Sequence, residues 1–159
     1  MAAKRKLIRK PFEKWSIQDL HDVFGLKLLS SMVQLTEWVA PTHPIPSDVR
    51  PRLEELRQHL YAYAGSWNET ELMFRFIAPF LNEVKFWGDS YNSFSDRKLS
   101  GTIDEYELTG WVDWMVASGE YEPKAPYFFL HEYKRFKMGN SDPLGQLLAE
   151  MVVVQQRNG

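Results

Sequence analysis

The segment YFFLHEYKRF, residues 127–136, constrains the fold more than any other part of the chain. A run of aromatic and apolar side chains favours a β-strand, and successive side chains of a strand point to opposite faces. One face carries five side chains, namely Phe128, Leu130, Glu132, Lys134 and Phe136. Because both faces are largely apolar, we expect a central strand that is covered on both sides.

Glu132 and Lys134 are the charged side chains on that face. Along a strand they point the same way and lie about 6–7 Å apart. Burying two charges is costly unless they pair with each other or bind something. Two interpretations therefore stand side by side: a structural ion pair on the solvent face of an edge strand, or a functional site.

The preceding strand-like segment, GWVDWMVAS at residues 110–118, also carries one isolated carboxylate, Asp113. If the two strands pair with these faces aligned, Asp113 and Glu132 converge beside Lys134. Two carboxylates in a dry cleft suit a hard divalent cation such as Mg²⁺, with Mn²⁺ as a substitute. A lysine there can orient the attacking water or neutralise charge in the transition state.

Local signals predict where the helices begin. Ser16 is expected to cap a helix over residues 17–24, and Asn68 or Thr70 a helix that Pro79 makes irregular. Asp142, followed by proline, is expected to cap the last helix. A further helix is expected after the turn-rich segment 41–51, with Ser47 or Asp48 as its N-cap.

Composition narrows the class of protein. The chain of 159 residues has no cysteine, which removes disulfides and thiolate metal sites from consideration. No apolar run reaches the roughly 18 residues of a membrane span, so we expect a cytoplasmic protein with no membrane partner. One compact domain is expected, with a basic arm and helical extension over residues 1–65 and a core over 66–159. The arm either contacts phosphate or an acidic partner, or is a solvated terminus.

Other side chains are assigned structural roles. The four histidines, at positions 21, 43, 59 and 131, lack the spacing of a zinc site. His131 is expected to be structural because it lies on the strand face opposite Glu132. Trp111 and Trp114 are predicted to be core residues rather than a base-stacking platform.

The order of elements, with Asp113 in one strand and Glu132-Tyr-Lys134 in the next, resembles the PD-(D/E)xK nuclease superfamily. The resemblance covers roughly Asn68 to Arg157. It implies an α/β (α+β) restriction-endonuclease-like core in the order α-β-β-β-α, with a central mixed sheet flanked by helices. The segment from Thr70 to Leu81 is also similar to the N-terminal nuclease domains of type I restriction subunits.

The resemblance implies a role for each matching residue. Glu71, Asp113 and Glu132 would hold the metal, Lys134 would be the catalytic lysine, and Gln146 would help to position the site. Arg135 and Lys137 extend a basic cluster that could meet a phosphate backbone, although a solvated run explains these two side chains equally well.

Three features depart from the family pattern. Val112 precedes Asp113 where the family name has proline, and Glu150 follows Gln146 at the position where some branches have tyrosine. Glu69 competes with Glu71 for the first-helix role. The family core normally continues with another strand, so either a longer protein or a partner would supply it.

The function expected from the resemblance is a Mg²⁺-dependent phosphodiesterase acting on DNA. The expected context is a homodimer or a larger multidomain or defence-system protein. The alternative is a catalytically inactive nuclease-fold module that binds nucleic acid or protein. The net negative charge of the chain outside its basic arm favours this alternative.

Overall fold

The computed structural model describes residues 7–40, 44–133 and 142–159. The chain forms two compact units. One covers the chain up to Gly25 and from Lys85 to Gly159, and the other covers Leu26–Val84. The sequence analysis expected a boundary at residue 65. In the structure, the start of the chain instead joins the C-terminal part in the first unit.

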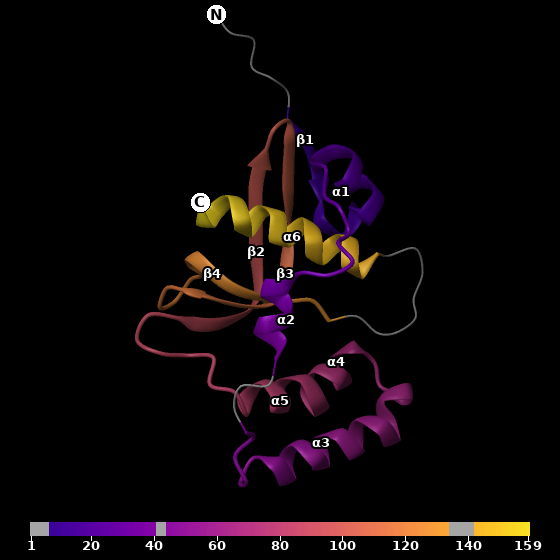
Figure 1. The fold of residues 1–159 in the computed structure, drawn as a ribbon, viewed down its shortest axis with the longest axis vertical. Coiled ribbons are helices and arrows are strands. Elements are labelled where there is room, and N and C mark those ends of the chain that lie inside the picture. The colour runs from indigo at the N-terminus through magenta and orange to yellow at the C-terminus, as the bar shows by residue number, and fades with distance from the viewer. Residues whose placement is uncertain (1–6, 41–43, 134–141) are drawn as a thin grey trace, which may run out of the picture. The chain divides into compact units, whose positions relative to one another are not determined.

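The first unit contains a four-stranded mixed sheet (Figure 1). Its strands are β1 (Ile8–Pro11), β2 (Asn92–Ile103), β3 (Tyr106–Ser118) and β4 (Lys124–His131). β2 and β4 pair with β3 in the antiparallel direction, whereas β1 pairs with β3 in parallel. The fold is therefore α+β, with the expected order of three consecutive strands between helices and one additional strand, β1, that was not predicted.

β3 is the central strand, and its two halves have different neighbours on one edge. β2 follows almost the whole of β3 on one side. β1 and β4 must therefore share the other side, where β1 ends with Pro11 opposite Thr109 and β4 ends with His131 opposite Trp114. The short stretch of β3 between Thr109 and Trp114 has no registered partner on this edge among the described strands, and Asp113 lies in it.

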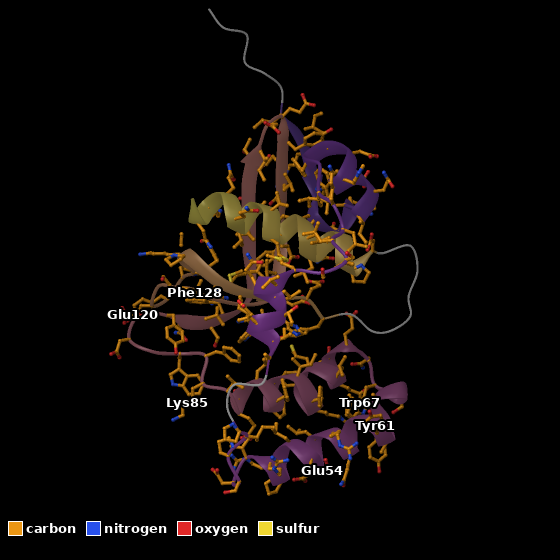
Figure 2. The ribbon with its side chains drawn as sticks, viewed as in Figure 1. Glu54, Tyr61, Trp67, Lys85, Glu120 and Phe128 are labelled. Atoms are coloured by element: carbon orange, nitrogen blue, oxygen red, sulfur yellow. The ribbon has the colours of Figure 1, made fainter. Side chains whose placement is uncertain are left out.

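The prediction that residues 127–136 form a central strand is wrong in two respects. β4 pairs only with β3 among the described strands, so it lies at an edge. It also ends at His131, which places Glu132 just beyond the strand. The apolar character of β4 reflects aromatic packing of Phe129 against Phe86 and Trp114, while Phe128 remains exposed (Figure 2).

The helices of the first unit are α1 (Ile17–Phe24) and α6 (Pro143–Asn158), together with the 3₁₀ turn η1 (Phe12–Lys14). Ser16 caps α1 through a capping box with Asp19, as predicted. Asp142 caps α6, also as predicted, by accepting a hydrogen bond from the Gly145 N–H at 2.9 Å. Its second oxygen accepts from the Ile17 N–H at 3.0 Å, so one carboxylate serves the first turns of both helices.

α6 packs on one face of the sheet, crossing β2 and β3 (Figure 1). The approach at its first turn is so close that a Cβ on Gly145 would overlap the carbonyl oxygen of Trp15. The buried core of this unit contains Phe12, Trp15, Leu108 and Val112, together with Val153 of α6. Burial of these large side chains supplies the main driving force for folding of this unit.

The second unit is helical in the described residues. Its elements are α2 (Val33–Val39), α3 (Arg50–Tyr63), η2 (Ala64–Ser66), α4 (Glu69–Leu72), η3 (Met73–Ile77) and α5 (Ala78–Asn82). Asn68 caps α4, as predicted, and the irregularity expected from Pro79 is present as the π-helical turn η3. The predicted cap of α3 is wrong, since Val49 stands at that position without a side-chain hydrogen bond.

None of the helices within the described part of the chain is both long enough and apolar enough to cross a membrane.

Candidate active site

Asp113 is half-buried on β3, at the part of the strand edge that neither β1 nor β4 covers. Its Oδ2 accepts a hydrogen bond from the main-chain N–H of Tyr133 at 2.7 Å. Because Tyr133 follows Glu132 directly, this bond brings the chain after β4 back onto the middle of β3. One carboxylate oxygen is thus held by the backbone, and the structure records no hydrogen bond to Oδ1 from the described residues.

An open pocket of about 510 Å³ lies at this place. Three of the predicted site residues line it: Asp113, Glu132 and Gln146. The other lining residues are Arg9, Pro11, Glu13, Lys98, Thr109, Gly110 and Trp111. The pocket therefore brings together Asp113 of β3, Glu132 just beyond β4 and Gln146 near the start of α6.

Gln146 projects into this pocket from α6, and only 8% of it is exposed. Its Nε2 donates a hydrogen bond to Oε1 of Glu150, which is fully buried, at 3.2 Å. A carboxylate accepts hydrogen bonds, so the amide group of Gln146 turns its nitrogen toward Glu150. The structure records no hydrogen bond to the side-chain carbonyl oxygen of Gln146 from the described residues.

Glu71 belongs to the second unit, where it occupies the first turn of α4. Its carboxylate accepts from the main-chain N–H of Asn68 at 3.0 Å and forms an ion pair with Arg75 at 3.3 Å. These contacts give Glu71 a local structural role in stabilising the start of α4. Lys134, Arg135 and Lys137 lie outside the described residues.

Sequence reasoning missed the other seven lining residues, among them Arg9, Glu13, Lys98 and Trp111. Arg9 and Glu13 were missed because β1 and η1 have no clear periodic pattern. Lys98 pairs directly with Trp111 between β2 and β3, which only the register shows. The prediction that Trp111 is a core residue is wrong, because 59% of it is exposed, whereas Trp114 is buried as expected.

Two neighbours of Asp113 are neutral near pH 7. Burial lowers the pKa of His131, and the charge of Asp113 opposes that shift only in part. Burial also raises the pKa of the Tyr133 phenol, and Asp113 raises it further. The rings of Phe129, His131 and Tyr133 lie in succession, but none of the three lines the pocket.

The donor chemistry of the pocket suits Mg²⁺. Asp113 and Glu132 offer hard oxygen ligands, and Mg²⁺ usually binds one or two carboxylates while keeping several waters. Among the residues that the structure describes, no three His, Asp or Glu side chains cluster closely enough to hold a metal. A magnesium ion held by Asp113 and Glu132 would therefore need water and substrate to complete its coordination.

Comparisons with protein-family models, curated proteins and solved structures gave no match to this chain.

Proposed function

We propose that this chain is a Mg²⁺-dependent phosphodiesterase that cleaves DNA, built on a PD-(D/E)xK-type, restriction-endonuclease-like core. The observation that carries the proposal is that Asp113 on β3 and Glu132 just after β4 line one pocket together with Gln146. The order of elements supports it, since α5 is followed by β2, β3, β4 and α6. The additional strand β1 extends this core along the free edge of β3.

In the proposed reaction, Asp113 and Glu132 would hold the metal ion. The chemistry that Mg²⁺ would supply there is the activation of water and the shielding of charge that develops on the phosphate. The Tyr133 N–H keeps the Asp113 carboxylate oriented. The amide oxygen of Gln146 accepts a hydrogen bond from the attacking water and so orients it. Lys134, two residues after Glu132, neutralises developing negative charge.

The decisive experiment is a cleavage assay on single-stranded, duplex and branched DNA, with Mg²⁺ or Mn²⁺ and with EDTA. Asp113→Asn keeps the shape of the side chain but removes its charge, and should abolish metal-dependent cleavage. Glu13→Gln is the matched control, because Glu13 lines the same pocket but has no role in the proposed metal site. Cleavage that survives in Asp113→Asn would show that the assigned roles are wrong.

A second candidate is a catalytically inactive nuclease-fold module that binds nucleic acid or protein. The engagement of Glu71 with Asn68 and Arg75 favours it, because a first-helix ligand is then committed elsewhere. Calorimetric titration with Mn²⁺ separates the two functions. Binding that disappears in Asp113→Asn supports the enzyme, whereas the absence of binding in both proteins supports the module. Light scattering of the same samples tests whether the protein is a homodimer.

A further inference from the structure

Trp111 is exposed in the middle of the central strand. Its neighbour Val112 is buried, as are Thr109 and Met115 on the same face of β3 as Trp111, so the exposure is local to Trp111 and does not reflect a frayed strand end. A single exposed aromatic side chain is common on protein surfaces, so the place of Trp111 in a pocket is what distinguishes it. Trp111 also lines the pocket that contains Asp113 and Glu132, which links the exposed ring to the candidate active site.

Two cationic side chains lie on the same face as Trp111. Lys98 stands directly opposite Trp111 in the register of β2 and β3 and is exposed. Arg9 stands opposite Glu107 in the register of β1 and β3 and forms an ion pair with it at 4.0 Å, and its side chain is 62% exposed. Directly opposed residues project to the same side of a sheet, as do alternate residues of one strand. Arg9, Lys98 and Trp111 therefore form a strip across three strands, which we call the stacking strip.

We infer that the stacking strip binds an unpaired stretch of DNA, with a base stacked on the Trp111 indole and phosphates beside Arg9 and Lys98. Aromatic side chains flanked by cations are the usual means of holding single-stranded nucleic acid, because every base offers a flat face. In a duplex these faces are covered by neighbouring bases. This inference rests on the proposed function, because it names unpaired DNA as the substrate class that reaches Asp113 and Glu132.

The charges of the pocket add a condition for binding. Arg9 and Lys98 stand beside three carboxylates, those of Glu13, Asp113 and Glu132. A phosphate chain that approaches the strip also approaches these carboxylates, which repel it. A divalent cation held by Asp113 and Glu132 removes this repulsion. Binding of single-stranded DNA should therefore strengthen when Ca²⁺ is added, and the strengthening should be lost in Asp113→Asn.

Fluorescence anisotropy in Ca²⁺ tests the role of Trp111, with a labelled thymidine oligomer of about 12 nucleotides as the probe and a duplex of equal length for comparison. Trp111→Ala should weaken binding of the oligomer about tenfold to a hundredfold. Trp111→Phe should retain most of the affinity, which excludes a folding defect as the cause. Trp87→Ala is the control, because Trp87 is 51% exposed in the same unit but lies outside this pocket.

The salt dependence of binding tests the cations. Each phosphate contact contributes about 0.7 to the slope of log affinity against log salt concentration for a single strand. Lys98→Ala should reduce the slope by about this amount. Lys85→Ala should leave it unchanged, since Lys85 is exposed in the same unit but does not line the pocket (Figure 2).

The outcomes separate this inference from the proposed function. If the oligomer binds through Trp111 but no DNA is cleaved, the stacking strip stands and the phosphodiesterase proposal falls. If DNA is cleaved but Trp111→Ala binds the oligomer like the wild type, the enzyme stands and the strip is overturned. Equal affinity for the duplex and the oligomer also overturns the inference, because it would show that unpaired bases are not required.

Discussion

The main-chain N–H of Tyr133 donates a hydrogen bond to Oδ2 of Asp113 at 2.7 Å, and this bond ties the segment after β4 to the middle of β3. Asp113 consequently has a structural task in addition to the chemical one that we propose. The two tasks can be separated, since asparagine keeps an oxygen acceptor whereas alanine does not.

Replacing Asp113 by alanine should lower the free energy of unfolding by about 1–2 kcal/mol, because a half-buried N–H loses a charged acceptor. Asp113→Asn should lower the free energy of unfolding by less, since its amide oxygen still accepts the hydrogen bond from the Tyr133 N–H. Urea unfolding monitored by circular dichroism measures both values. Glu120→Ala, at an exposed position of the same unit, serves as the control. Equal losses for alanine and asparagine would show that the bond to Tyr133 contributes little.

Gly145→Ala should destabilise the protein by about 1–3 kcal/mol, because the added methyl group overlaps the backbone of Trp15 and Ser16. Helix propensity alone predicts instead that alanine stabilises the helix by about 1 kcal/mol relative to glycine. Gly65→Ala is the matched control, since nothing lies within 4 Å of its new Cβ. Thermal unfolding of both variants decides the matter, and a Gly145→Ala protein as stable as Gly65→Ala would contradict the close approach of α6.

The Asp19 carboxylate should make stability depend on pH in the acid range. The Ser16 backbone N–H, the Ser16 hydroxyl and Lys10 lower the pKa of Asp19 below 3.8 in the folded state. The unfolded chain then binds more protons, so the stabilisation is present above pH 3.8 and is lost as pH falls through the lowered folded value.

Asp19→Asn removes that carboxylate and should lower the free energy of unfolding by about 0.5–1 kcal/mol at pH 6. This value is at the low end of capping effects because solvent screens the side chain. Urea unfolding at a series of pH values measures the difference between the two proteins. The difference should shrink as pH falls below 3.8. A difference that stays constant down to pH 3 would mean that the charge of Asp19 plays no part.

Gln146→Ala should reduce metal-dependent cleavage about tenfold to a hundredfold while leaving Mn²⁺ affinity nearly unchanged, because the amide orients the water and does not hold the ion. Single-turnover rates and calorimetry give the two quantities. Gln155→Ala on the exposed side of the same helix should behave like the wild type. A large loss of Mn²⁺ affinity in Gln146→Ala would instead make Gln146 a ligand.

Local signals allowed much of the fold to be predicted. Ser16, Asn68 and Asp142 cap helices through contacts with residues three positions away, and such contacts are visible in sequence. The face of β3 that carries Asp113 likewise follows from alternation along one strand.

The remaining features depend on pairings between distant segments. β1 is four residues long and has no alternating pattern, so only its pairing with β3 identifies it as a strand. Glu132 lies beyond β4 because pairing with β3 stops at His131, although the aromatic pattern continues. Trp111 is exposed although Thr109 and Met115, on the same face of β3, are buried, and a strand pattern does not reveal which side chain of an apolar face stays uncovered.

The pairing of Ile8 with Tyr106 also has a consequence for how the molecule folds. The two residues are about 100 positions apart, and contacts of such long range raise contact order and slow folding. On the ribosome, β1 emerges first and must wait for its partner strand, while the intervening helical unit is synthesised. We expect the capture of β1 by β3 to be a late step in folding, so that a chain stalled before this step exposes an unpaired strand edge beside Asp113 and is prone to aggregate.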